Sequence, residues 1–328
     1  MTQIRPKYMP IVVRENGLLE GEPDKPYTFA SSGSFKSAFE VVECIYLKAG
    51  AIEVLAQIAD AALADWSTAK CLEHTYKFFQ FGVFPQFIVD RTRTGVRYFG
   101  IHLRPQGQDY SPESGGRRIH ISGELVDAAE KEGSKNLIPS FKLIHAISHE
   151  IAHVFLSYCF WVSANEGGPP QMHTPPKLNY LDRYGKGKEI GEAGYYMDRY
   201  IWGGAVFYPD MTSHANGQPS VFRHEDNPKN IWVQISDAKL IEIIFMCYTT
   251  SPSIPIIRYL PEDGQMLVAD DGDIPKDLKP RSVPVTTPPE QHVQDRRKRK
   301  SRGSAAEEPP PKETTTRRSR YGLRKRGV

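Results

Sequence analysis

The feature that most constrains this chain is the pentapeptide His149-Glu150-Ile151-Ala152-His153, which lies inside the apolar run from Phe141 to Trp161. The apolar residues around it recur at helical spacing: Leu143, Ile144, Ile147, Ile151, Val154 and Phe155. On a helix, residues four positions apart lie about 40° apart around the axis and about 6 Å apart along it. The imidazoles of His149 and His153 are therefore expected to face the same point.

The pattern H-E-x-x-H indicates a metal site because its residue types suit zinc chemistry. Neutral imidazole is a good zinc ligand, with Zn–N distances of about 2.0–2.1 Å. Glu150 follows the first histidine and points to the side, where it can accept a proton from water without taking a coordination position. Two histidines and a glutamate on an apolar helix are costly to bury without partners, which favours a metal over a chance occurrence of the pattern. The sequence predicts Zn²⁺ bound by His149 and His153, with Glu150 as the general base.

A catalytic zinc site usually has a third protein ligand, and the sequence leaves its identity open. The metzincin pattern H-E-x-x-H-x-x-G-x-x-H is excluded, because Leu156 and Cys159 stand where it needs glycine and histidine. The acidic and histidine residues further along are Glu166, His173, Asp182, Glu189, Glu192, Asp198, His214 and His224. We favour Glu192, at the start of a predicted helix Glu189–Trp202, with Asp198, His173 and His224 as the main alternatives.

Aromatic and histidine residues near these ligands are further candidates. Tyr195 and Tyr196 follow Glu192 by three and four residues and so lie on roughly its face of the helix. A phenol near zinc could donate a hydrogen bond to the oxyanion formed on peptide attack, and Tyr196 is the candidate for this role. The alternative is that both tyrosines only pack. His145, one turn before His149, could support the site, but an ordinary satisfied or surface histidine is the favoured interpretation.

Together with H-E-x-x-H, the segment Gly191-Glu192-Ala193-Gly194 resembles the gluzincins and G-E-x-G segments in uncharacterised fungal H-E-x-x-H proteins. The resemblance covers two short segments. It implies a zincin-like metallopeptidase whose third zinc ligand is a glutamate on a downstream helix. One departure is clear, because the thermolysin-like pattern has an aspartate four residues after that glutamate, where this chain has Tyr196. Asp198 is a possible substitute as the group that orients a metal-binding histidine.

The hydrophobic pattern predicts an α+β fold in which N-terminal helices and a small mixed sheet pack on the active-site helix. The expected helices are Phe35–Trp66 with a break at Gly50, Gly123–Glu132, Ser140–Trp161, Glu189–Trp202 and Ala238–Tyr248. The expected strands are Phe84–Val89, Val96–Leu103, Arg118–Ser122, Ala205–Tyr208 and Ile231–Ile235. In zincins an edge strand lies beside the cleft and can pair with an extended peptide. Ile119–Ser122 is our candidate for it, and an interior position is the open alternative.

Charge divides the chain into a mildly acidic body and a basic tail. Residues 281–328 hold 14 Lys or Arg and 5 Asp or Glu, a net charge of +9, whereas the whole chain has a net charge of +3. We therefore expect an extended segment at 1–33, a zincin-like metallopeptidase domain at 34–273, and a disordered basic tail at 274–328. The runs Arg296–Lys300 and Arg317–Arg326 are typical of nuclear localisation signals or polyanion contacts.

These features predict an intracellular protein with the nucleus as its candidate location, and a nuclear import receptor or a polyanion as partner of the tail. No secretion signal, disulfide framework or membrane span is expected. The predicted activity is zinc-dependent hydrolysis of a peptide or protein substrate. The alternatives are a zinc hydrolase acting on another amide and a non-catalytic zincin-fold interaction protein recruited to nucleic acid or nuclear partners by its basic tail. An intact Glu150 argues against the non-catalytic alternative, because a structural zinc site needs no general base.

Overall fold

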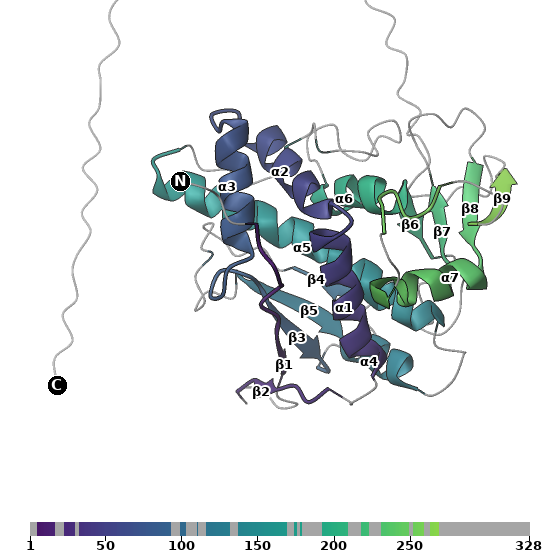
Figure 1. Cartoon of the computed structure of the whole chain (residues 1–328). Coiled ribbons are helices and arrows are strands. Elements are labelled where there is room, and N and C mark those ends of the chain that lie inside the picture. Colours follow the sequence, from purple (N-terminus) through teal and green to yellow (C-terminus); the bar gives the residue numbers. More distant parts are fainter. Residues whose placement is uncertain are drawn as a thin grey trace, which may run out of the picture. The chain divides into compact units, whose positions relative to one another are not determined.

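The helix predicted around the H-E-x-x-H motif is α5 (Leu137–Asn165), and every other α-helix that the structure describes packs on it. In Figure 1 it crosses the middle of the molecule, with the first sheet on one side and the helices of the N-terminal half around it. Most of its residues are buried on all sides, which explains why its sequence is apolar around the whole helix and not along one stripe. The motif therefore lies at the centre of the fold.

The computed structural model describes residues 5–16, 23–29, 33–92, 99–102, 110, 116–131, 137–168, 174–175, 178, 192–208, 218–222, 231–248, 252–258 and 263–268. All of them belong to one unit, Met1–Val283. The predicted tail 274–328 with both basic runs lies outside the described residues. So do several candidate third ligands: His173, Asp182, Glu189, His214 and His224.

The described residues form a mixed α/β fold. Its other helices are α1 (Ser34–Leu47), α2 (Ala51–Ala62), α3 (Thr68–Phe78), α4 (Gly123–Glu130), α6 (Ala193–Trp202), α7 (Asp237–Ile244) and the 3-10 helix η4 (Met246–Tyr248). Its strands are β1 (Val12–Glu15), β2 (Lys25–Pro26), β3 (Gln86–Asp90), β4 (Gly100–Ile101), β5 (Arg118–Ser122), β6 (Ala205–Phe207), β7 (Ser220–Phe222), β8 (Ile231–Ile235) and β9 (Gly264–Val268). Among the described helices, none is long and apolar enough to cross a membrane.

Local sequence signals explain several element ends. The predicted break at Gly50 separates α1 from α2, and Gly50 has a φ of 96°, a left-handed conformation that favours glycine. Ser236 caps α7 by accepting a hydrogen bond from the Lys239 amide. Gly203, with a φ of 84°, ends α6. Helix α3, which the sequence analysis did not predict, begins after the cap Ser67.

The first sheet is mixed, with strand order β2-β1-β3-β5-β4. Strands β1, β3 and β5 run parallel, while β2 and β4 pair antiparallel at the two edges. The prediction that Ile119–Ser122 is an edge strand is therefore wrong. It belongs to β5, between β3 and β4, and the edge strand beside α5 is β4. Strand order depends on pairing between distant segments, which the local hydrophobic pattern does not encode.

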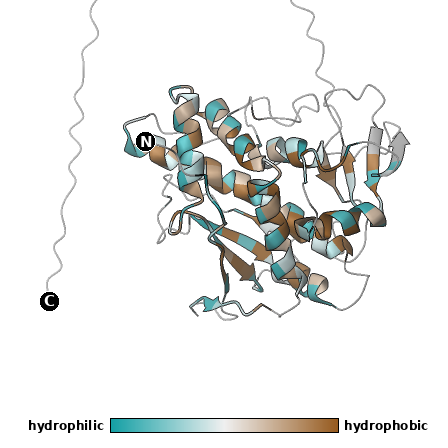
Figure 2. Cartoon of the chain, in the orientation of Figure 1, coloured by the Kyte–Doolittle hydropathy of each residue, from teal (hydrophilic) through white to brown (hydrophobic). Residues whose placement is uncertain are grey.

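The core lies between this sheet and the helices. Figure 2 shows hydrophobic residues, in brown, along strands of the first sheet and along α5. Helix α1 is fixed to α5 by a buried hydrogen bond of 2.9 Å, which the Tyr46 hydroxyl donates to the carbonyl of Ser148, next to the motif. The second sheet has the order β6-β7-β8-β9 and is antiparallel throughout. The four cysteines are free, and Cys44, Cys71 and Cys159 are buried.

Candidate metal centre

The two histidines of the motif lie on one face of α5, as the helical spacing predicted, and this face meets the first turn of α6. Their ring centroids lie 5.2 Å apart on α5. Helix α6 packs against α5 and brings Glu192 to them. The Glu192 Oε1 atom lies 3.6 Å from His149 Nε2 and in closer contact with His153 Nε2. One ligand atom from each of these three residues can be chosen so that all three lie within 4.8 Å of one another.

Glu192 occupies this place because it is the N-cap of α6. The sequence analysis began this helix at Glu189, whereas its first residue in the structure is Ala193. The Glu192 backbone is extended, and its Oε2 atom accepts a hydrogen bond from the Tyr195 amide. One carboxylate therefore satisfies a free amide at the helix start with one oxygen and faces the histidines with the other. The cap fixes the carboxylate more firmly than an exposed position within the helix would.

Gly194 allows α6 to approach this closely. A Cβ atom at this position would lie less than 3.0 Å from three atoms of the His149 ring, including Nε2. Any other residue would therefore overlap the imidazole. The ring of Tyr195 also contacts His149, edge to face, with centroids 5.4 Å apart. The first turn of α6 thus shapes one wall of the candidate site.

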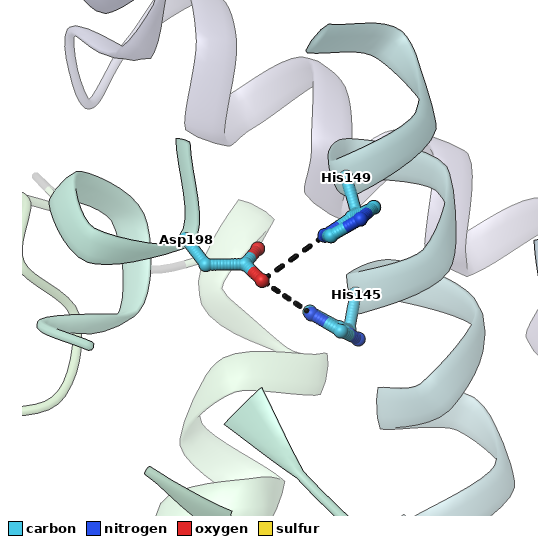
Figure 3. A group of neighbouring side chains, drawn as sticks. All are labelled: His145, His149 and Asp198. Carbon is cyan, nitrogen blue, oxygen red and sulfur yellow. Dashed lines mark hydrogen bonds and ion pairs between the residues drawn. The ribbon is translucent and has the colours of Figure 1, made fainter. Parts of the chain in front are cut away.

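Asp198 lies one turn further along α6, fully buried, and accepts hydrogen bonds from two histidines. Its Oδ2 atom lies 3.1 Å from His149 Nδ1 and 3.0 Å from His145 Nε2. Figure 3 shows the carboxylate pointing between the two rings, which lie on successive turns of α5. Because an ionised carboxylate can only accept, both histidines carry their proton on the nitrogen that faces Asp198. The Nε2 atom of His149 is then the ring nitrogen that remains for a metal ligand.

The electrostatics of the cluster favour a cation. Burial acts to lower the pKa of His149, but the charges of Asp198 and Glu192 outweigh it and hold the pKa well above its ordinary value. Burial acts to raise the pKa of Glu192, yet His153 and His149 hold it well below its ordinary value. Burial likewise acts to raise the pKa of Asp198, but the charges of His145 and His149 outweigh it and lower the pKa. Two carboxylates therefore stay ionised around His149.

Glu150 lies between α5 and the edge strand. It is 8% exposed, and its Oε2 atom accepts a hydrogen bond of 2.8 Å from the amide of His102, the residue after β4. Gly100 in β4 lies so close that a Cβ atom there would be 3.0 Å from Glu150 Cγ. His102 also reaches α5, where its Nε2 atom lies 2.9 Å from Ser157 Oγ. The carboxylate of the predicted base is thus held by the backbone that follows the edge strand.

Two other predicted residues, Tyr196 and Glu166, make contacts of their own. The hydroxyl of Tyr196 lies 3.4 Å from that of Tyr200, and their rings pack 5.3 Å apart, so its oxyanion role stays a prediction. Tyr195 is the tyrosine whose ring contacts His149. Glu166, a minor candidate ligand, instead pairs with Lys70 at 2.5 Å.

Sequence reasoning ranked one residue too low and did not single out two others. His145 was expected to be an ordinary histidine, yet it shares Asp198 with His149. Its position four residues before His149 was the signal that both lie on one face of the helix. The structural role of Gly194 could have been suspected from its place two residues after the favoured ligand. Nothing in the sequence pointed to His102.

Comparison of the chain with protein-family models, with curated proteins and with solved structures gave no match. The interpretation of the site therefore rests on its geometry and chemistry.

Proposed function

We propose that this protein is a zinc-dependent peptidase of zincin-like architecture, with His149, His153 and Glu192 as the metal ligands. The observation that carries the proposal is the approach of Glu192 from a second helix to both histidines of the motif. In a tetrahedral zinc site with ligand bonds of about 2.1 Å, ligand atoms lie about 3.4 Å apart. The distance of 3.6 Å between His149 Nε2 and Glu192 Oε1 is close to that value.

The donor set suits zinc in chemistry as well as in geometry. Two imidazoles and one carboxylate form a common set in catalytic zinc sites, which keep a fourth position open. His149 donates its Nδ1 proton to Asp198, an arrangement that fixes the ring and raises its strength as a ligand. A bound zinc ion supplies a Lewis acid that polarises a carbonyl group and lowers the pKa of a water molecule to about 7.

Glu150 and strand β4 would carry out the remaining parts of the reaction. Glu150 accepts the proton of the attacking water and transfers it to the leaving amine, with its carboxylate anchored by the His102 amide. Strand β4 is the edge of the first sheet and lies against Glu150 through Gly100. An extended peptide that paired with β4 through backbone hydrogen bonds would place its carbonyl groups beside the base. This edge supports a peptide as the substrate.

The test uses the purified full-length chain and its Glu150→Gln variant. Zinc content is measured by elemental analysis, and hydrolysis is measured on a library of unstructured peptides with and without a chelator. We expect one zinc per chain in both proteins, and hydrolysis in the wild type that the variant lowers by at least about 100-fold. A wild type without stoichiometric zinc would refute the metal site. Zinc without hydrolysis of any peptide would refute the peptidase and leave either an enzyme for another amide or a non-catalytic zinc protein.

A further inference from the structure

The side chain of His102 bridges the first sheet and helix α5 beside Glu150. Its Nδ1 atom lies 3.1 Å from the carbonyl oxygen of Arg118 in β5, and its Nε2 atom lies 2.9 Å from Ser157 Oγ in α5. Ser157 is buried and follows Glu150 by seven residues, so both lie on the same face of α5. The ring of His102 therefore connects a strand and a helix through one atom pair on each side.

Both contacts have the donor and the acceptor that a hydrogen bond needs. The carbonyl oxygen of Arg118 can only accept, so His102 Nδ1 carries a proton and donates it. The hydroxyl of Ser157 can donate or accept, so it suits Nε2 whether that nitrogen is unprotonated or protonated. When Nε2 is protonated, the proton of the hydroxyl goes to the carbonyl oxygen of His153, 3.1 Å away. The bridge is thus complete in both charge states of the ring.

The bridge lies at the end of a short edge strand. Strand β4 consists of Gly100–Ile101 and pairs with β5 through these two residues. The amide of Ser122 in β5 donates to the carbonyl of Phe99 at 3.0 Å, so alternate residues of β5, including Arg118, turn their backbone groups toward β4. Because a two-residue ladder supplies few hydrogen bonds, the ring of His102 adds to what holds this end of the strand.

His102 also holds the proposed base, through its backbone. Its amide donates to Glu150 Oε2 at 2.8 Å, and Glu150 is 8% exposed. An amide can orient a carboxylate only if the amide itself is fixed in place. The residue after an edge strand needs a contact beyond the ladder for this, and the imidazole supplies two. The side chain of His102 therefore acts on Glu150 through the amide of the same residue.

We propose that the side chain of His102 is a positioning residue for Glu150, which fixes the amide that orients the carboxylate by bridging β5 and α5. Without the bridge the strand end moves, and a reacting group displaced by about 1 Å can lower a rate by about 100-fold. The part that His102 plays in hydrolysis rests on the proposed function. The bridge and its hold on the amide do not depend on that function.

The first test measures hydrogen exchange of single amides by NMR in the full-length protein with a chelator, so that zinc plays no part. We expect the His102 amide to be protected in the wild type and to exchange about fivefold faster in Ser157→Ala, which breaks one contact of the bridge. The amide of Gln86, which donates to the Arg117 carbonyl at 2.7 Å, serves as the unchanged reference. An unprotected His102 amide in the wild type, or equal exchange in both proteins, would overturn the proposal.

The second test measures peptide hydrolysis and zinc affinity in a double-mutant cycle. Asparagine at position 102 can place its amide nitrogen where Nδ1 lies, and so keeps the contact with Arg118, but it is too short to reach Ser157. We expect His102→Asn, Ser157→Ala and the double variant each to lower kcat about fivefold at unchanged KM and zinc affinity, because all three break the same contact. His102→Ala breaks both contacts and lowers kcat further. A loss of about 25-fold in the double variant, or a parallel loss of zinc affinity, would contradict the proposal.

His74 offers the matched control. It is buried, and its Nδ1 atom lies 3.2 Å from the hydroxyl of Tyr158, the residue after Ser157 in α5. His74→Asn should lower stability and leave kcat unchanged, whereas a fall in kcat equal to that of His102→Asn would reduce the effect of His102 to general stability and overturn the proposal. A wild type that hydrolyses no peptide would refute the proposed function, while the exchange measurement would still decide whether the bridge holds the amide.

Discussion

The Gly194→Ala variant tests whether the packing of α6 on α5 sets the geometry of the metal centre. The added methyl group would lie less than 3.0 Å from three atoms of the His149 ring. Gly194 does not have a positive φ, so its backbone conformation suits alanine. In an exposed helix the same substitution would stabilise the protein by about 0.5–1 kcal/mol. Here the clash must move either the imidazole or the helix.

The expected magnitude follows from two opposing effects. Forcing a methyl group into a packed core costs about 1–3 kcal/mol, which exceeds the gain in helix propensity. We therefore expect the metal-free variant to lose about 0–2 kcal/mol of stability. Zinc binding suffers more, because the displaced atom is His149 Nε2, and a misplaced ligand lowers zinc affinity by about 10–100-fold. The distinguishing result is a loss of zinc affinity out of proportion to the loss of stability.

The assay pairs chemical unfolding of the metal-free protein with zinc titration in competition with a dye. Ala193→Gly, in the same helical turn, is the control. It lowers stability by about 1–2 kcal/mol, because Ala193 is buried and glycine is a poorer helix former, and it adds no atom near the His149 ring. If Gly194→Ala were more stable than wild type and bound zinc within twofold of it, then the first turn of α6 would not lie against His149. The proposed centre would lose the contact that defines it.

Three further variants test other parts of the structure. Asp198→Asn should weaken zinc binding about 10–100-fold, because an amide oxygen cannot accept from His145 and His149 as a carboxylate does; unchanged competition titrations would contradict this. Gly100→Ala should reduce peptide hydrolysis while zinc affinity stays constant, because the new Cβ would lie 3.0 Å from Glu150 Cγ and its nearest neighbours include no proposed metal ligand. Parallel losses of hydrolysis and zinc affinity would argue against this account. Burial acts to raise the pKa of Asp90, but hydrogen bonds from Thr92 and Asn16 outweigh it and lower the pKa from 3.8 to about 2. The ionised form of Asp90 therefore contributes about 2 kcal/mol of stability above pH 4, and this is lost as the pH falls from about 4 to about 2. Acid unfolding of Asp90→Asn should show a shallower pH dependence than wild type, and identical curves would refute this account.

The sequence by itself determined the parts of the site that lie on one helix. Helical periodicity around the motif placed His149 and His153 on one face of α5, since the geometry of a helix is fixed by its backbone alone. It also determined local ends such as the break at Gly50 and the cap at Ser236, because these depend on the conformation or side chain of a single residue.

Only the tertiary structure decided what meets that face. Glu192 was one candidate among several until the packing of α6 on α5 brought its carboxylate to both histidines. Asp198 likewise became the acceptor for His149 only through that packing. The edge position of β4, and not of β5, required the order of the sheet. These features depend on contacts between segments far apart in the chain, whose energies come from shape and burial that no local pattern records.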